Sequence, residues 1–284
     1  MKLLSFRYGD KDSYGLVSGE RVLDLGCHLE HPNLRSALAA GALPEIAALA
    51  RREAADLALS KIEFLPVIPD AGKIICVGRN YLDHVNEGNN KPTEKPMLFS
   101  RFPSSHVGHR EPLVRPFVST HFDYEGELAV IIGKVARHVK AEQALDYVAG
   151  YTCFNDGSVR DWQKHTHQLL QGKTFWRSGA IGPWLVTADE ISDPSKLSLT
   201  TRVNGEQVQH STTNKMIFNV PFLIEYISTI IDLQPGDIIA TGTPDGVGLH
   251  RKPQLFLRAG DTVEVDISGI GVLKNSVVDE TRPD

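Results

Sequence analysis

The chain has 284 residues, of which 41% are hydrophobic and 23% are charged, and its formal net charge at pH 7 is −5. These values are typical of a soluble globular protein, and the lack of a basic stripe excludes nucleic acid as an expected partner. No apolar run reaches the ~20 residues that cross a bilayer, and charged residues appear too early for a secretory signal peptide. We therefore expect a cytoplasmic protein without a membrane partner, whose scattered cysteines are reduced thiols: Cys27, Cys76 and Cys153.

Residues 1–65 are expected to form a small N-terminal α+β domain. Turn-forming residues separate short apolar runs there, which indicates strands at 3–6, 14–17 and 21–23. The segment 33–59 is rich in alanine, leucine, arginine and glutamate, and a glycine and a proline interrupt it, so two helices are expected. A linker at 65–70 would then lead into a second domain, 70–284.

Strands dominate this second domain. Apolar or alternating runs bounded by turn residues predict strands at 73–77, 128–132, 148–154, 198–203, 238–240, 262–267 and 272–278. Asn204-Gly205 between two such runs predicts a tight hairpin. Helices are expected at 141–148, 158–170 and 219–231. A few helices placed irregularly among many strands favour an α+β fold over a doubly wound α/β sheet.

The pattern Glu125-Gly126-Glu127 precedes the apolar run 128–132 and suggests a metal site. Residues i and i+2 of a strand share one face, with their bases roughly 6–7 Å apart. Two carboxylates that close repel unless a positive charge lies between them, and Mg²⁺ and Ca²⁺ prefer carboxylate oxygens. Asp156 ends a second apolar run and offers a third carboxylate. The alternative is that the glutamates form the solvated face of an edge strand, which the apolar residues downstream disfavour.

A histidine and a glutamate follow the predicted strand 73–77 at helical spacing. If the segment after Gly78 forms a helical turn, His84 and Glu87 face the same side. Glu87 could then fix the tautomer of His84 and raise its basicity, which would suit a general base. The alternative is an ion pair on the surface.

Lys173 stands among apolar and aromatic residues, and a lysine held near carboxylates and a metal could bind a substrate oxygen. The alternative is a surface lysine whose stem lies along apolar neighbours. The glycine-rich loop 241–248 lacks the Gly-Lys-Ser/Thr ending of a phosphate loop, so an ATP site is not expected. His165 and His167 are expected to lie on the surface.

Taken in order, these motifs resemble the fumarylacetoacetate hydrolase superfamily over about residues 70–280. The resemblance rests on six segments: Gly78-Arg79-Asn80-Tyr81 with His84, Asp123-Tyr124-Glu125-Gly126-Glu127-Leu128, Asn155-Asp156, Asn204-Gly205-Glu206 with Gln209, Pro235-Gly236-Asp237 to Gly248, and Ala259-Gly260-Asp261. In one departure, Thr174-Phe175-Trp176 follows Lys173 where much of the family has Ser-Phe-Asp, which suggests a different substrate.

The resemblance implies a mixed β-sandwich or roll in the C-terminal domain, so the expected fold class is α+β. It also implies a homodimer, and a Mg²⁺ ion, with Mn²⁺ or Ca²⁺ as alternatives, held by Glu125, Glu127 and Asp156. The implied substrate is a small 2-oxo or 1,3-dioxo carboxylic acid that is cleaved, decarboxylated or isomerised.

The leading hypothesis from the sequence is metal-dependent hydrolysis of a carbon–carbon bond in a substrate of the acylpyruvate or fumarylacetoacetate type. His84, oriented by Glu87, would activate water, and Lys173 would stabilise the enolate. The residues expected to bind the substrate are Arg79, Tyr81, Gln209 and Thr243. Three alternatives stay open: decarboxylation of oxaloacetate, isomerisation of 2-hydroxyhepta-2,4-diene-1,7-dioate in aromatic catabolism, and a catalytically silent metal-binding module.

Overall fold

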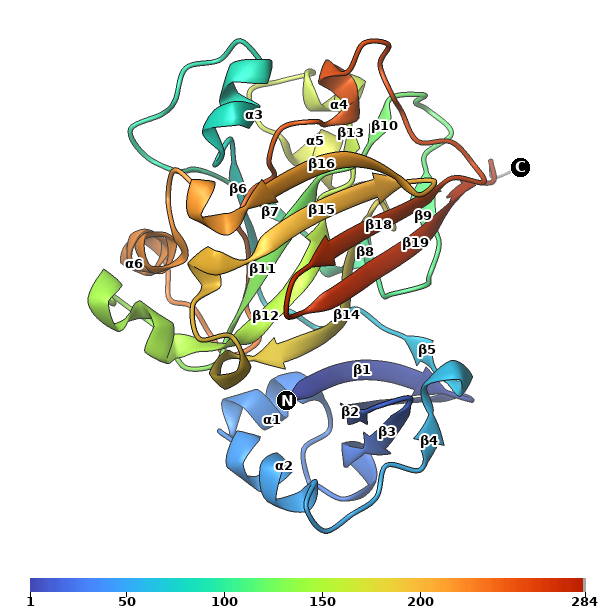
Figure 1. Ribbon diagram of the computed structural model, residues 1–284, viewed down its shortest axis with the longest axis vertical. Helices are drawn as coiled ribbons and strands as arrows, with labels where there is room; N and C mark the ends of the chain where they lie inside the picture. Colours follow the sequence, from blue (N-terminus) through green and yellow to red (C-terminus); the bar gives the residue numbers. More distant parts are fainter. Residues whose placement is uncertain (283–284) are drawn as a thin grey trace.

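The computed structural model describes residues 1–282 of the chain, and two large sheets dominate it (Figure 1). The first sheet has 12 strands, with the main order β4-β3-β2-β1-β14-β12-β11-β17-β6-β7, while β5 pairs with β1 and β8 pairs with β14. Its strands are β1 (Lys2–Tyr8), β2 (Lys11–Ser18), β3 (Arg21–Asp24), β4 (Leu57–Ala58), β5 (Glu63–Phe64), β6 (Ile74–Gly78), β7 (Met97–Arg101), β8 (His106–Val107), β11 (Gly126–Ile132), β12 (Val148–Asn155), β14 (Gly179–Thr187) and β17 (Ile238–Ala240).

The second sheet has five strands in the order β16-β15-β18-β19-β9 and packs against the first. Its strands are β9 (Leu113–Arg115), β15 (Ser198–Val203), β16 (Glu206–Thr212), β18 (Thr262–Ile267) and β19 (Gly271–Asp279). One apolar core lies between the sheets, in which Leu199 and Val265 of the second sheet share a cluster with Val130 of the first. Both sheets mix parallel and antiparallel pairs, which confirms the expected α+β fold.

The strand that carries the predicted metal site runs through the middle of the large sheet. β11 pairs antiparallel with β12 on one side and with β17 on the other, and each of its residues is buried. Apolar residues on both faces suit this central position, because both faces are covered. The structure therefore rules out the alternative of a solvated edge strand for Glu125-Gly126-Glu127.

The predicted hairpin at Asn204-Gly205 is present between β15 and β16. Asn204 has φ 53° and Gly205 has φ 84°, which are the positive angles that a tight two-residue turn of this type requires. Helix α6 (Val220–Ile230) matches the expected helix, and the side chain of Asn219 caps it by accepting a hydrogen bond from Phe222 N.

Two other predicted helices are different in the structure. The segment expected to be a helix at 158–170 divides into β13 (Ser158–Val159), α4 (Arg160–Gln163) and α5 (Leu170–Lys173). It divides because β13 pairs with β10 (Phe122–Asp123), which extends the chain before α4 can begin. The segment expected at 141–148 is a 3-10 helix, Ala141–Tyr147, and the large sheet takes up Val148.

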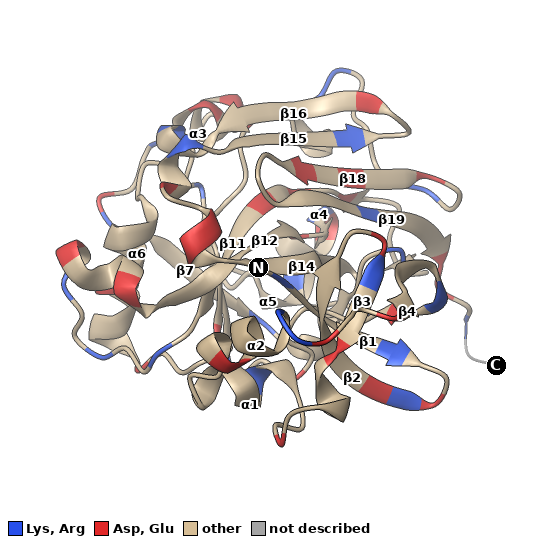
Figure 2. Ribbon diagram, turned by 60° about the horizontal axis from the view of Figure 1, so that its bottom comes forward, with Lys and Arg blue, Asp and Glu red and all other residues tan. Residues whose placement is uncertain are grey.

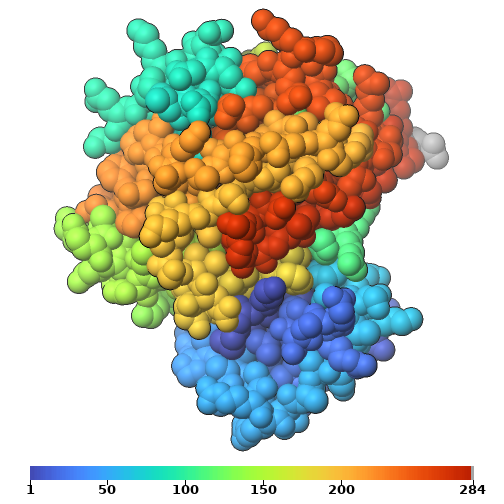
Figure 3. All heavy atoms as spheres, in the orientation of Figure 1, coloured from blue at the N-terminus to red at the C-terminus, as the bar shows by residue number. Residues whose placement is uncertain are grey.

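The N-terminal segment contains the expected three strands and two helices, α1 (Leu34–Ala39) and α2 (Leu43–Leu49). It forms a lobe at one end of the molecule (Figure 3). Its strand β1 also pairs antiparallel with β14, so the lobe continues the large sheet. The division into domains 1–65 and 70–284 stays a prediction.

Among the helices of residues 1–282, none is long and apolar enough to cross a membrane. Acidic and basic residues are intermingled along the elements, as Figure 2 shows.

Candidate metal centre and active site

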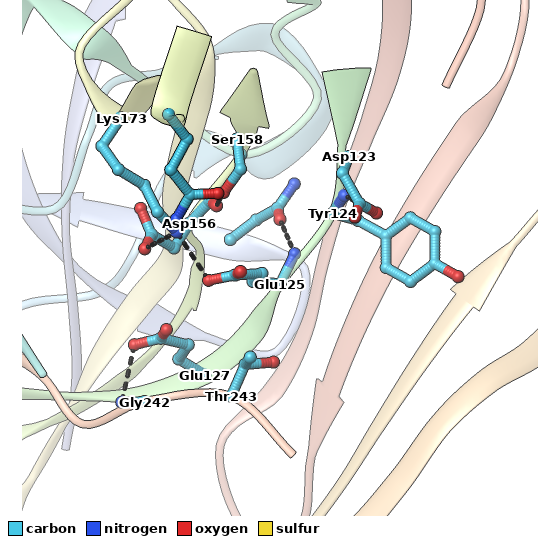
Figure 4. Close-up of polar contacts among 12 residues, drawn as sticks. Asp123, Tyr124, Glu125, Glu127, Asp156, Ser158, Lys173, Gly242 and Thr243 are labelled. Carbon is cyan, nitrogen blue, oxygen red and sulfur yellow. Dashed lines mark hydrogen bonds and ion pairs between the residues drawn. The ribbon is translucent and has the colours of Figure 1, made fainter. Parts of the chain in front are cut away.

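The pairing of β11 with β12 brings three carboxylates together at one end of these strands. Gly126 lies opposite Asn155, so Glu125 and Glu127 flank the point where the chain leaves β12 through Asp156. One oxygen of each carboxylate lies within 4.8 Å of the other two, and all three side chains are buried (Figure 4). The structure thus gathers the three residues that the sequence singled out, while their role as metal ligands stays a prediction.

Three buried cations surround two of these carboxylates. Lys173 Nζ donates to Glu125 Oε2 and to Asp156 Oδ2, both at 2.7 Å. Arg160 Nη1 lies 2.7 Å from Glu125 Oε1, and Arg101 Nη1 contacts Asp156 Oδ1. Each oxygen of Glu125 and Asp156 therefore faces a positive charge, which offsets the cost of burying these ions away from water.

Glu127 has a different environment. It accepts a hydrogen bond from Gly242 N at 2.8 Å, but within residues 1–282 no basic side chain forms a salt bridge with it. Burial and the charges of Asp156 and Glu125 raise the pKa of Glu127 well above its ordinary value. Burial acts in the same direction on Glu125, but its two neighbouring cations outweigh it and lower the pKa of that carboxyl.

This donor set fits a divalent metal. The oxygens converge within one coordination sphere, and one of the carboxylates has no positive partner of its own. Hard divalent cations such as Mg²⁺ and Mn²⁺ prefer such oxygen ligands, and their charge would relieve the repulsion at Glu127.

The glycine-rich loop after β17 contacts this cluster through the hydrogen bond from Gly242 N to Glu127. Gly242 has φ +99°, and a Cβ there would lie 2.7 Å from Asn80 Cβ, so a larger residue does not fit without strain. Thr243 Oγ1 donates to Gly126 O at 2.9 Å, and Gln209 Nε2 donates to Thr243 Oγ1 at 2.8 Å. Gln209 Oε1 in turn accepts from Gly126 N at 2.9 Å. A residue of the second sheet therefore fixes both the loop and β11.

The segment after β6 is anchored by Asn80. Its amide nitrogen donates to Thr241 O and Phe218 O, and its amide oxygen accepts from Phe218 N. Next to this anchor, Arg79 has φ 56°, in the left-handed region that arginine rarely adopts. Backbone held in sparsely populated regions is concentrated at functional sites.

These segments enclose a cavity of about 810 Å³. The predicted site residues that line it are Arg79, His84, Glu125, Glu127, Asp156, Lys173 and Thr243. Tyr81, Gln209 and Glu87 do not line it. Tyr81 is buried and forms a β-bridge with Met216, and Gln209 is buried behind Thr243. Neither side chain therefore lies at the cavity surface in this structure, and their direct contact with substrate stays a prediction.

The predicted histidine and glutamate pair is formed on helix α3 (Leu82–Glu87). His84 Nδ1 lies 2.8 Å from Glu87 Oε1, and Gly246 N donates to Glu87 Oε2 at 2.9 Å. His84 and Glu87 therefore face the same side of the helix, as their spacing predicted. A carboxylate at Nδ1 fixes the tautomer and leaves Nε2 as the ring nitrogen available to the cavity.

Three residues at the site escaped the sequence analysis, Arg101, Arg160 and His250, and the cavity position of a fourth, His167, was not expected. Arg101 and Arg160 reach the carboxylates only because distant strands pair, which no local pattern reveals. His167, expected on the surface, is exposed but also lines the cavity. One signal was available, since an arginine inside the largely apolar run 97–101 needs a carboxylate partner if it is buried.

Residues 73–278 of the chain match the fumarylacetoacetate (FAA) hydrolase C-terminal domain. The chain belongs to the fumarylacetoacetate hydrolase family. It is also 42% identical over 293 residues to a mitochondrial oxaloacetate tautomerase of Xenopus laevis, a match that covers 98% of this chain and 90% of the frog protein.

Two solved structures of this family share the fold over 99% of this chain and 100% of their own. The maleylpyruvate hydrolase of Sphingobium sp. SYK-6, in complex with manganese(II) ion and pyruvate, has a TM-score of 0.82 and 28% identity. The 2-hydroxyhepta-2,4-diene-1,7-dioate isomerase of Mycobacterium marinum has a TM-score of 0.77 and 32% identity.

The protein is therefore an enzyme of the fumarylacetoacetate hydrolase family. The expected cytoplasmic location is contradicted, because the frog relative is a mitochondrial protein by name. That expectation rested on the lack of a secretory signal and of a membrane span, and neither feature distinguishes the cytoplasm from mitochondria.

Proposed function

We propose that this fumarylacetoacetate hydrolase family enzyme interconverts the enol and keto forms of oxaloacetate, with Mg²⁺ or Mn²⁺ bound by Glu125, Glu127 and Asp156. The observation that carries the proposal is the 42% identity, over 98% of the chain, to an oxaloacetate tautomerase. The site supports it, because the carboxylates, Lys173 and His84 all line one cavity. The reaction is closer to the isomerase alternative than to the hydrolysis favoured from the sequence.

The site offers two sources of positive charge for an enolate. A divalent ion at the carboxylates would supply Lewis-acid stabilisation of the oxygen on C2. Lys173 supplies the other: burial favours its neutral form, but Asp156 and Glu125 outweigh burial and raise the pKa of the amine. The ammonium therefore stays charged and can donate a hydrogen bond to that oxygen.

Tautomerisation moves protons and leaves the carbon skeleton intact. In the enol-to-keto direction, the hydroxyl on C2 loses its proton, the C2–C3 double bond becomes single, and C3 gains a proton. His84 delivers the proton to C3 through Nε2, since Glu87 occupies its Nδ1, and the proton released at oxygen restores the imidazolium directly or through solvent.

The test follows the ultraviolet absorbance of enol oxaloacetate in the presence of Mg²⁺. The purified protein should speed the loss of this absorbance, and His84→Ala should slow the catalysed rate roughly 100-fold, a typical contribution of a proton carrier. A decay that the protein leaves at its spontaneous rate would refute the proposal. If the protein binds Mg²⁺ and oxalate but turns over no 2-oxo acid, the silent-module alternative holds instead.

Hydrolysis is the second candidate, and the His84–Glu87 pair favours it because the pair could activate a water molecule. A coupled assay for pyruvate separates the reactions. Pyruvate released from an acylpyruvate indicates hydrolysis, pyruvate released from oxaloacetate indicates decarboxylation, and tautomerisation releases none.

A further inference from the structure

Within residues 1–282, four of the basic side chains that line the cavity have no carboxylate partner: Arg79, Lys164, His167 and His250. Lys164 and His167 are exposed after the four-residue helix α4, whereas the backbone at Arg79 and at His250 is held in place. Arg79 follows β6, and His250 ends the 3-10 helix η8 (Gly248–His250). Within residues 1–282, neither side chain forms a hydrogen bond or a salt bridge, although the buried cations Lys173 and Arg160 each contact carboxylates. A cation that faces a cavity without a counter-charge is suited to bind an anionic group of a ligand.

The backbone at both positions is fixed. Arg79 is held at φ 56° beside the anchored Asn80. The helix that carries His250 is held by Asp123, whose carboxylate accepts hydrogen bonds from Gly248 N at 2.8 Å and Leu249 N at 2.9 Å. The two side chains are therefore presented from rigid segments, which favours selective binding over general attraction of anions.

The imidazole of His250 lies close to Gly88, which also lines the cavity. A Cβ added at Gly88, next to the end of α3, would lie 3.3 Å from His250 Nε2. The ring centroid of His250 is 6.4 Å from that of His84. A glycine at position 88 thus leaves room for an imidazole beside the proton-carrying histidine.

We propose that Arg79 and His250 bind the second carboxylate of the substrate, and so make the enzyme selective for 2-oxo dicarboxylic acids over 2-oxo monocarboxylic acids. This inference rests on the proposed function and adds the determinant of its specificity. The 2-oxo acid end binds at the carboxylate cluster, while the other end meets the guanidinium and the imidazole. A monocarboxylic acid leaves both groups without a partner, and sites built to pair a charged group discriminate strongly against ligands that lack it.

A matched pair of stable ligands tests the inference without turnover. N-oxalylglycine and N-ethyloxamate share one oxamate end. At the other end, N-oxalylglycine has a carboxylate where N-ethyloxamate has a methyl group. In calorimetric titrations of the Mg²⁺-loaded protein, N-oxalylglycine should bind roughly 10- to 100-fold more tightly, the range expected for one or two charge-assisted hydrogen bonds.

The ratio of the affinity for N-oxalylglycine to the affinity for N-ethyloxamate is the quantity compared among variants. Arg79→Met and His250→Phe should each reduce this ratio at least several-fold, and the double variant should bring it close to one. Affinity for N-ethyloxamate should be unchanged in all of them, which also shows that they fold and load metal. Methionine adds no new backbone strain at φ 56°, because arginine already bears it. Arg258→Met is the control, since Arg258 is exposed and lies outside the cavity, and it should keep the full ratio.

A wild-type ratio near one, a ratio that survives in the double variant, or binding of neither ligand would overturn the inference. Tautomerase activity is measured on the same preparations. Activity without a ratio refutes the specificity determinant alone, whereas a ratio without activity refutes the tautomerase proposal and leaves a binding site for 2-oxo dicarboxylic acids.

Discussion

Glu127 is the carboxylate of the cluster that bears the highest electrostatic cost, because burial and two charged neighbours act on it together. Changing Glu127→Gln should lower the affinity for Mg²⁺ at least ~100-fold and abolish turnover, since a charged ligand is lost. Without metal, the stability should not fall, because the amide oxygen can still accept the hydrogen bond from Gly242 N. Calorimetric titration with Mg²⁺ and thermal unfolding with and without the ion provide the measurements.

Glu142→Gln, which removes an exposed charge on the 3-10 helix Ala141–Tyr147, serves as the control and should leave both quantities unchanged. Undiminished Mg²⁺ affinity in Glu127→Gln would mean that this carboxylate is not a ligand.

Arg101 holds Asp156, one of the proposed metal ligands, in place. Its guanidinium contacts Asp156 Oδ1, Gly157 O at 3.0 Å and Ser178 Oγ at 2.8 Å. Lysine cannot reproduce this fork, so Arg101→Lys should lower Mg²⁺ affinity roughly 10- to 100-fold, as other outer-shell changes do. The same titration measures it, with Arg115→Lys at the exposed pair with Asp279 as the control. If Mg²⁺ affinity fell equally in Arg101→Lys and Arg115→Lys, the effect would come from replacing any arginine by lysine and not from a specific role of Arg101.

For single residues, the sequence predicts the relative placement of side chains that are close together in the chain. Glu125 and Glu127 follow from the two-residue period of a strand, and His84 with Glu87 follows from the turn of a helix. Arg101 and Arg160 could not be found in this way, because the pairing of strands far apart in the chain brings them to their carboxylates. His250 could not be found either, because only the fold brings its segment to the cavity. Tyr81 belongs to a recognisable motif, but it is buried and does not line the cavity, so its contact with substrate stays a prediction.

Among the elements, β5 and β19 meet at His109. Its ring packs edge-on against Phe64 at 4.7 Å between centroids, and its Nδ1 accepts a hydrogen bond from Lys274 N at 3.1 Å. Burial, with the nearby charges of Arg110 and Lys274, lowers the pKa of His109 from 6.5 to about 4. The folded state therefore keeps a neutral imidazole where the unfolded chain would bind a proton.

Because the pKa is lower in the folded state, His109 contributes stability above pH 6.5 that is lost as the pH falls toward about 4. Urea unfolding at pH 7 and pH 5 should show a decrease in the free energy of unfolding for the wild type. His109→Gln should reduce that decrease by on the order of 1–2 kcal/mol, while the exposed control His28→Gln should not. An identical pH dependence in wild type and His109→Gln would contradict this account.

The elements that the sequence predicted correctly are those with a strong periodic pattern or a definite cap. β11 and the hairpin at Asn204-Gly205 belong to this group, as does α6 with its cap at Asn219. The helix predicted at 158–170 was wrong, because the pattern of apolar residues in this segment reflects contacts with β10 and with the cavity. A tertiary contact of this kind overrides local helix propensity.

For the molecule as a whole, the central question is whether the N-terminal lobe folds alone. Leu3 and Leu34 of the lobe belong to the same apolar cluster as Ile131 and Phe154 of the central strands. A shared core couples the two parts, so the intact chain should unfold in one calorimetric transition, with equal calorimetric and van't Hoff enthalpies. Two separate transitions would instead support independent domains at 1–65 and 70–284.

The expected homodimer is a proposal that the surface supports. Trp176 is 59% exposed and Phe102 is 53% exposed, and the two lie in neighbouring segments joined by the hydrogen bond from Arg177 N to Ser104 O. Exposed aromatic residues that gather in one area mark interaction surfaces. Sedimentation should give a dimer, and Trp176→Glu should shift it toward monomer, whereas Tyr8→Glu at the exposed end of β1 should not. A wild-type monomer at micromolar concentration would refute the proposal.

The double contact of Lys173 with Glu125 and Asp156 affects how the enzyme matures in a cell. The ammonium acts as a built-in counter-ion, so a newly made chain can bury these two acids before any magnesium reaches it. Small domains organised around zinc lack such a group and stay unfolded until their ion arrives. Here the chain can complete folding in ion-poor surroundings, and loading of the proposed metal ion would be a later and reversible event.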